Sequence, residues 1–381
     1  MPLLTLGFRP FFLAAGASAF LSLLVWLGML HGLFPINLQF AGSAWHAHEM
    51  LYGYAMAAIA GFLLTAVRNW TGQQTAAGAE LAGLALLWLL ARALPWLTLP
   101  ALLGAGLAAA FPLLLGWSLR RPLWGGQNPV NRVFLLLLAG MALAAFWSQM
   151  RAAGAVPPGL LDADTLMLDL ILLTLLIVSG RVLPFFTRAA LPGAEPHSSP
   201  WLEKLTFIAA GVWISADLAS PWPILTAAAS LTLAVILSLR IGGWHDRRAW
   251  GVPILAVLYA GALWLIAGLA LKALAELELV APNPALHALT VGAIGVFTIG
   301  MMVRITLGHT GRPMSAPASL TAAFVAVNAA ALIRVFFPLL WPNAYSTWML
   351  LSGLLWVGAF AVFLLVLGPM LLGPRADGKP I

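Results

Sequence analysis

The sequence predicts an all-α, polytopic membrane protein, a bundle of about twelve transmembrane helices with both termini in the cytoplasm. Three observations lead to this prediction. Of the 381 residues, 62% are hydrophobic and only 8% are charged, whereas a soluble domain carries about 25% charged residues. The apolar residues form runs of about 20, which is the length that crosses a hydrocarbon core. Lysine and arginine recur at alternate ends of these runs, as the positive-inside rule requires.

The apolar runs of spanning length can be placed in order along the chain. They lie near residues 11–31, 45–66, 78–95, 98–118, 130–149, 164–186, 202–219, 222–240, 252–275, 284–304, 318–340 and 345–372. Turns rich in Gly and Pro separate them, for example at residues 125–129 and 281–284. The third, fourth, seventh and eighth runs are short, so a count of eleven is the alternative. Because no linker or polar block divides the chain, we predict one membrane domain over residues 1–381.

The cations allow the helix count to be checked. With twelve helices and a cytoplasmic N-terminus, 15 of the 19 Lys and Arg residues fall at the inner side of the membrane. The exceptions are Arg92, Arg151, Lys272 and Arg334. A miscount of one helix in the middle of the chain would scramble this arrangement. The basic pI of about 10.5 has the same origin, and no basic run with interleaved aromatic residues indicates nucleic-acid binding.

Several kinds of chemistry are excluded by the composition. The chain has no cysteine, which excludes disulfides, zinc–thiolate sites, iron–sulfur clusters and a thiol nucleophile. It has no Walker A sequence and no Gly-rich dinucleotide fingerprint. Any haem would be bound non-covalently, because the Cys-x-x-Cys-His attachment motif is absent. The main carboxylates within apolar runs are Asp169 and Asp217, which is little for an ion-coupled carrier.

Histidines near membrane depth are candidate site residues, because polar groups are costly there. The predicted topology places His31, His46, His48 and His287 near the outer face, and His197, His245 and His309 at the inner side. The densest cluster is the sequence WHAHEM at residues 45–50. Imidazole is a common ligand for copper, iron and zinc, and a Met thioether suits copper(I).

This cluster is either a binding site or a pair of interfacial histidines. Residues two apart point away from each other on a regular helix, so His46 and His48 bind one ion only if the turn is irregular. On a regular helix, His48 shares its face with Tyr52 and the two histidines serve different partners. The alternative is a pair of interfacial histidines beside a tryptophan of the aromatic belt.

The tenth run begins at His287 and is followed by His309. A straight helix would separate these two residues by about 33 Å, so one histidine belongs to an outer site and the other to an inner site. Glycines on both sides of His309 permit close backbone approach. Arginines nearby are natural anion binders, although anchoring at lipid headgroups is their alternative role. The candidate arginines at the inner side are Arg9, Arg181, Arg304 and Arg312.

Taken in order, these motifs resemble the NnrS family of bacterial membrane proteins. The matching segments are residues 7–12, 45–50, 61–67, 69–72, 131–132, 180–187, 287–289 and 307–312. They extend over essentially the whole chain. One departure is visible, since the family usually has Pro where this chain has Arg68. That departure puts the local conformation after the second run in doubt.

The resemblance implies a haem- and copper-containing protein of the bacterial inner membrane that acts in the response to nitric oxide. It implies copper and non-covalent haem b as cofactors, with His46, His48, His287 and His309 as the metal ligands. Haem propionates could pair with Arg9, Arg181, Arg304 and Arg312. Electrons would come from a quinol or a redox protein partner, because nothing indicates a flavin or nicotinamide site. Nitric oxide would enter from the lipid bilayer, into which it partitions.

A transporter or metal permease is the alternative function. Twelve helices suit many carriers, and the outer cluster of His, Met and Glu could serve as an entry site. Carriers often have repeated halves with broken helices at the midplane of the bilayer. The sequence shows no convincing internal repeat, and its histidines lie near the membrane faces. A sensor or assembly factor without turnover is a third hypothesis.

Overall fold

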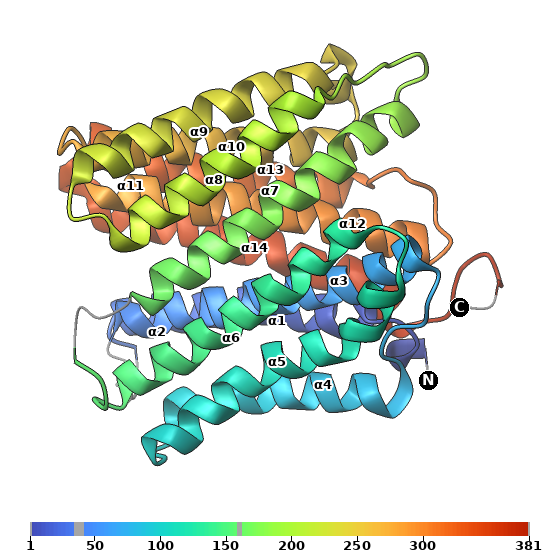
Figure 1. Cartoon of the computed structure of the whole chain (residues 1–381), viewed down its shortest axis with the longest axis horizontal. Helices are drawn as coiled ribbons and strands as arrows, with labels where there is room; N and C mark the ends of the chain where they lie inside the picture. Colours follow the sequence, from blue (N-terminus) through green and yellow to red (C-terminus); the bar gives the residue numbers. More distant parts are fainter. Residues whose placement is uncertain (1, 34–41, 158–161, 380–381) are drawn as a thin grey trace. The chain divides into compact units, whose positions relative to one another are not determined.

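The structure is a computed structural model that describes residues 2–33, 42–157 and 162–379, and within these residues every regular element is a helix (Figure 1). The chain forms two compact units. Unit 1 comprises Met1–Leu170, Ile305–Pro313 and Phe363–Ile381, and unit 2 comprises Ile171–Arg304 and Met314–Val362.

Helices occupy all twelve predicted positions. Those that begin in unit 1 are α1 (Phe8–Leu30), α2 (Ser43–His48), α3 (Met56–Thr71), α4 (Gly78–Ala91), α5 (Ala101–Gly125), α6 (Val133–Ala152) and α7 (Ala163–Ala190). Those that begin in unit 2 are α8 (Pro200–Ala219), α9 (Pro223–Trp244), α10 (Pro253–Glu276), α11 (Pro282–His287), α12 (Phe297–His309), α13 (Ala318–Leu340) and α14 (Tyr345–Leu372). Two of the predicted spans contain a pair of helices, α2 with α3 and α11 with α12. The all-helical, polytopic prediction is confirmed.

Eleven spans in the described part of the chain are long and apolar enough to cross a membrane. Helix α8 is the one that falls short, because it carries Glu203, Lys204 and Asp217. Two of these charges are paired inside unit 2. Glu203 accepts from Arg240 of α9, and Asp217 lies 2.7 Å from the amine of Lys272 on α10. The two counts considered from the sequence therefore differ by α8 alone.

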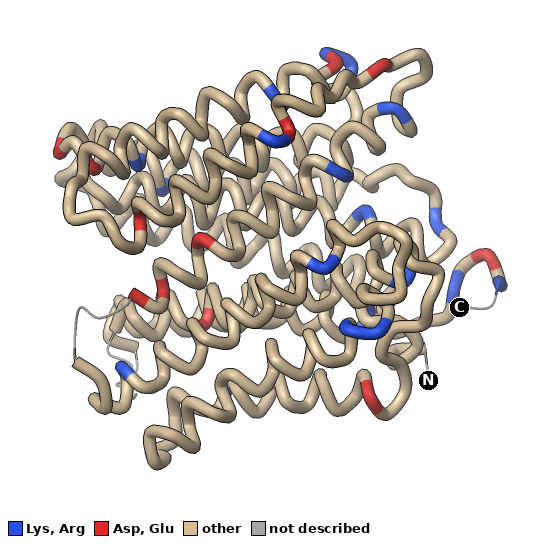
Figure 2. Tube along the Cα trace, viewed as in Figure 1, with Lys and Arg blue, Asp and Glu red and all other residues tan. Residues whose placement is uncertain are grey.

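The ends of unit 1 agree with the predicted topology. The start of α1 and the end of α14 lie at the same end of its helices (Figure 1), and most of the Lys and Arg residues of this unit lie at that end too (Figure 2). Cations gathered at one end are what the positive-inside rule requires of the cytoplasmic side. The assignment of that end to the cytoplasm stays a prediction.

The four cations that break the positive-inside pattern all have partners inside their own unit. Arg92 pairs with Glu49, Arg151 with Asp162, Lys272 with Asp217, and Arg334 with the hydroxyl of Tyr345. A charge or hydroxyl beside the cation offsets the cost of placing it at the outer side. The exceptions are therefore consistent with the predicted orientation.

Glycines in the left-handed conformation end two of the longest spans. Gly72 follows α3 with φ 68° and donates to the carbonyl of Arg68 at 2.9 Å, as a C-terminal glycine commonly does. Gly311 follows α12 with φ 70°. Because Arg68 lies in the last regular turn of α3, the departure from the family pattern at this position leaves the helix intact.

Two spans depart from regular α-helix. Glu49–Ala55, between α2 and α3, is a π-helix, and so is Ala288–Val296, between α11 and α12. Such segments are rare and often occur at functional sites. Each begins at the residue after a candidate histidine, His48 or His287. The span from His287 to His309 is therefore not a regular α-helix throughout, and the separation of these two residues stays a prediction.

Arg240 of α9 is a buried cation that depends on a glycine of α7. Its Nε donates to Glu203 Oε1 at 2.8 Å, and its Nη1 donates to the carbonyl of Leu176 at 3.2 Å. A Cβ atom at Gly180 would overlap Nη2 of Arg240. The space that Gly180 leaves is therefore filled by the guanidinium, which gives this glycine of the 180–187 motif a structural role.

We expect Gly180→Ala to destabilise the protein by about 1–3 kcal/mol, the usual cost of forcing a methyl group into a packed site. Thermal unfolding of the purified protein in detergent measures this effect. Gly211→Ala on α8 is the matched control, since among the described residues nothing lies within 4 Å of a Cβ at that position. Equal melting temperatures for both variants would contradict the role assigned to Gly180.

Candidate functional site

A small cavity in unit 1 lies beside the first π-helix. Its volume is about 10 Å³, close to the smallest space that holds one water-sized molecule. The side chains of His48, Tyr52, Met56, Arg92 and Met167 line it, and the rest of the wall is apolar and comes mainly from α5 and neighbouring helices. An imidazole, a phenol, a guanidinium and two thioethers thus meet around a space of diatomic size.

The two histidines of the WHAHEM cluster face different aromatic partners. His48 is 2% exposed and its ring stacks on Tyr52, with the centroids 4.7 Å apart. His46 stacks on Trp26 of α1, with the centroids 5.2 Å apart and the rings nearly parallel. The shared face of His48 and Tyr52 is confirmed. The two histidines thus stack on different aromatic rings, and their binding of one ion or of different partners stays a prediction.

Glu49 and Arg92 form a buried ion pair next to the cavity. Arg92 Nη1 lies 3.2 Å from both carboxylate oxygens of Glu49, and their side chains are 15% and 6% exposed. The indole of Trp88, one turn before Arg92 on α4, donates to the carbonyl of Gly53 at 3.1 Å. These contacts fix α4 against the π-helix, so the cavity wall is held by polar as well as apolar contacts.

The hydroxyl of Tyr52 lies among acceptors from α7. It is 3.1 Å from the carbonyl of Ala163 and 3.1 Å from Asp164 Oδ1. Ser148 of α6 donates to the same carboxylate oxygen at 3.4 Å. Spacing from His48 pointed to Tyr52 in the sequence, but Arg92, Met167 and Asp164 lie on other helices. No local signal in the sequence could have joined them to this site.

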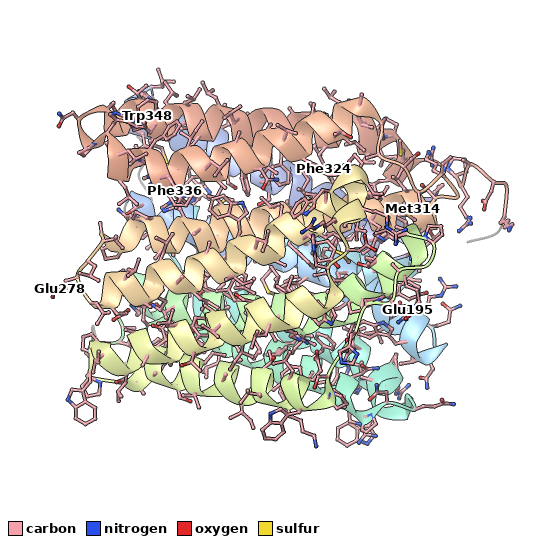
Figure 3. The ribbon with its side chains drawn as sticks, turned by 90° about the horizontal axis from the view of Figure 1, so that it is seen from above. Glu195, Glu278, Met314, Phe324, Phe336 and Trp348 are labelled. Carbon is pink, nitrogen blue, oxygen red and sulfur yellow. The ribbon has the colours of Figure 1, made fainter. Side chains whose placement is uncertain are left out.

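His287 in unit 2 ends α11. Figure 3 shows Glu278, in the connection before α11, at one end of the helices of this unit and Met314 at the other. The Nδ1 atom of His287 is 2.8 Å from the carbonyl of Asn283. A carbonyl only accepts hydrogen bonds, so Nδ1 is the donor, and in the neutral ring Nε2 carries the lone pair. Metal-binding histidines are commonly oriented in this way.

His309 lies among cations of unit 1. Its ring is 5.6 Å from that of Phe8, and its Nε2 is 3.5 Å from Nδ2 of Asn69. Arg375 donates to its carbonyl at 3.1 Å, and the charges of Arg68 and Arg375 act on its imidazole. Such surroundings favour an anionic group over a bare metal ion.

The C-terminal tail closes over the end of α12. The amide of Ala376 donates to the carbonyl of Thr310 at 2.8 Å, and Arg375 Nη2 lies 2.6 Å from Asp377 Oδ2. Hydrogen bonds from Arg375 lower the pKa of Asp377 from 3.8 to about 2. Because the pKa of Asp377 is lowered in the folded protein, its carboxylate stabilises the folded tail at pH values above the usual aspartate pKa. This stabilisation is lost as the pH falls towards 2. The pair is therefore intact at neutral pH.

The four candidate arginines differ in their surroundings. Arg9 is fully buried, and its Nη1 donates to the carbonyls of Leu371 at 2.9 Å and Gly373 at 2.6 Å. It therefore satisfies the C-terminal end of α14 within unit 1. Arg312 Nη1 donates to the carbonyl of Thr310 at 3.3 Å. These contacts are structural, and binding of a propionate by either arginine stays a prediction.

The other two candidate arginines belong to unit 2. Arg304 is 7% exposed and its guanidinium lies 3.6 Å from the centroid of the Phe186 ring. Among the described residues no hydrogen-bond partner meets its buried Nη1. Arg181 is half-buried on α7. Folding has already removed this guanidinium from water. An anion that binds its unsatisfied N–H group therefore avoids the cost of desolvating the cation.

The four predicted ligand histidines are divided between the two units. His46, His48 and His309 belong to unit 1, and His287 belongs to unit 2. Over residues 2–33, 42–157 and 162–379, no three His, Asp or Glu side chains lie close enough to hold a metal ion. A metal at His48 would need other donors, and the thioethers of Met56 and Met167 line the same cavity.

Comparison with known proteins gives one match that covers nearly the whole chain. A family model described as NnrS protein matches residues 2–375. A search of curated proteins finds no match. All of the candidate histidines and arginines lie within the matched residues.

Proposed function

This chain belongs to the NnrS family of multi-pass membrane proteins of the nitric oxide response, and from that premise we propose that it binds copper at the His48 cavity and haem b at His309. The observation that carries the proposal is the lining of the cavity. Imidazole and thioether are ligands that suit copper(I), and His48, Met56 and Met167 all reach this space. The cavity is too small for a porphyrin, so it fits the metal ion and not the haem.

Haem fits the surroundings of His309 better. Non-covalent haem needs an axial imidazole and cations for its two propionates. Arg68 and Arg375 are close enough to act on the imidazole of His309, and Arg312 follows it by three residues. When bound, the two cofactors would supply redox chemistry and affinity for nitric oxide. The residues of this chain would position them and exclude bulk water.

The setting of this function follows from the same proposal. Nitric oxide dissolves in lipid, and the cavity lies within a membrane-spanning bundle. The bacterial inner membrane is the compartment that the family resemblance implies. Electrons for a redox reaction would come from a quinol or a redox protein partner, since the sequence offers no flavin or nicotinamide site.

The proposal predicts that the His48→Ala variant loses copper and keeps haem. The substitution removes an imidazole donor from the cavity and none from the haem site. Metal analysis and reduced-minus-oxidised optical spectra of the purified protein measure the two losses separately. His31→Ala is the matched control, since His31 is exposed at the end of α1. A properly matured wild-type preparation without haem and copper would defeat the proposal.

A transporter is the second candidate, and the π-helices favour it. Carriers commonly build substrate sites from interrupted helices at corresponding places, and Glu49–Ala55 and Ala288–Val296 are such interruptions. Flux of copper(I) into liposomes that contain the protein, without bound haem, would support the carrier over the redox protein.

A further inference from the structure

The span of His48 and the span of His287 are built alike. Residues 48–72 and 287–311 align without a gap, and both segments begin with His and end with Thr-Gly. In both, a π-helix begins directly after the histidine, and the final glycine is left-handed, with φ 68° and 70°. The identical residues are His48 and His287, Gly53 and Gly292, Gly61 and Gly300, Thr71 and Thr310, and Gly72 and Gly311.

The preceding helix packs on the shared glycines in the same register in both units. A Cβ at each glycine would strike a side chain of that helix. On α1, Gly53 faces Ser18, and Gly61 faces Phe12 and Phe11. On α10, Gly292 faces Trp264, and Gly300 faces Val257 and Leu258. The contacts on each helix are thus six and seven residues apart. The helix pairs therefore have the same packing as well as the same sequence pattern.

The following helices match as well. Helix α4 buries Leu81, Leu84, Trp88 and Ala91, and α13 buries Leu320, Ala323, Val327 and Ala330 at the same spacing. The first four helices, α1 to α4, thus recur as α10 to α13. This recurrence was not evident from the sequence alone. Only five of 25 residues are identical in the central span, which is too few to stand out among apolar helices.

The two copies differ around the histidine. The counterparts of Glu49 and Arg92 are Ala288 and Ala331, and both alanines are fully buried. In the same alignment, Val291 replaces Tyr52 and Gly295 replaces Met56. The second copy folds without any of these polar groups or the thioether. The fold therefore does not require them in the first copy, where Tyr52, Met56 and Arg92 line the cavity. Glu49 pairs with Arg92 beside it.

The histidine is the polar residue that both copies keep at this position. In the second copy it is held in a defined state, because its Nδ1–H donates to the carbonyl of Asn283 at 2.8 Å. In the neutral ring that bond leaves the lone pair on Nε2. Donation to a backbone carbonyl is a common way to orient an imidazole that ligates a metal.

We propose that the chain is an internal duplication in which each copy presents one equivalent histidine, so that His287 ligates a metal centre of its own, separate from the one at His48. The proposal rests on the proposed function. In the second copy Ala288, Val291 and Gly295 stand at the positions of Glu49, Tyr52 and Met56, so these positions supply no second donor beside the imidazole. A bare ion needs several protein donors, whereas a metalloporphyrin brings four nitrogen ligands and needs an axial one. The geometry therefore points to a second haem.

The haem and copper contents of single variants test this proposal. We expect His287→Ala to lose about half of the haem, since one of two axial imidazoles is removed, and to keep the copper. His48→Ala should lose copper alone. His287→Met keeps an axial ligand, so it should retain haem with an altered spectrum and reduction potential. His245→Ala is the matched control, because His245 is exposed and ends α9.

The outcomes separate the two proposals. Unchanged haem content and spectrum in both His287 variants would overturn the second site and leave the proposed function standing. Joint loss of copper and haem in His48→Ala and in His287→Ala would indicate one composite centre and would also overturn it. Addition of imidazole to His287→Gly should restore the missing spectral feature, which guards against a variant that merely folds poorly. A wild-type protein without either cofactor would reject the proposed function itself.

Discussion

Arg92→Ala is expected to destabilise the protein by about 3–5 kcal/mol, because it leaves the carboxylate of Glu49 buried without its partner. The double variant Glu49→Ala/Arg92→Ala should be close to wild type in stability. Replacing a buried ion pair by apolar residues is often neutral. The second copy already contains that replacement, with Ala288 and Ala331 at the same positions.

Thermal and denaturant unfolding of the two single variants and the double variant give the coupling between the charges. Arg151→Ala is the control, because its pair with Asp162 is 41% and 61% exposed and such pairs contribute about 0–1 kcal/mol. If the double variant is as unstable as Arg92→Ala, the pair is needed by the fold, and the argument from the duplicated copy fails. A stable double variant that has lost copper would assign the pair to the site.

Arg9→Met is the second variant with a large expected effect. Arg9 Nη1 donates to the carbonyls of Leu371 and Gly373 and lies 3.4 Å from that of Met370. Methionine fills the space without these bonds, and each buried carbonyl left unsatisfied costs about 1–3 kcal/mol. We therefore expect a loss of several kcal/mol, with the end of α14 opening first.

Hydrogen exchange and limited proteolysis over residues 363–379, measured on protein without added cofactor, locate this effect. Arg121→Met is the control, since Arg121 is exposed on α5. Faster exchange confined to the tail supports the structural role of Arg9. Normal exchange combined with loss of haem would instead assign Arg9 to a propionate, as the family resemblance implies.

The sequence by itself determined the secondary structure, because spanning length and hydropathy are local properties. An apolar run of about 20 residues has one stable state in a bilayer, and all twelve predicted positions are helical. The positions of Lys and Arg along the chain predicted the topology for the same reason. The sequence also marked His48 and Tyr52 as neighbours, since four residues span one helical turn.

Only the tertiary structure decided what these residues meet. Glu49 pairs with Arg92, the residue after α4, and Tyr52 contacts Asp164 on α7. Met167 of α7 also lines the cavity. Helix packing in lipid is set by shape and by a few polar contacts, so composition does not reveal which helices are neighbours. The duplication was hidden for the same reason, because apolar residues exchange freely where the spacing of small residues is kept. The two copies share the histidine at the start of the span, the glycines that pack on the preceding helix and the Thr-Gly at its end.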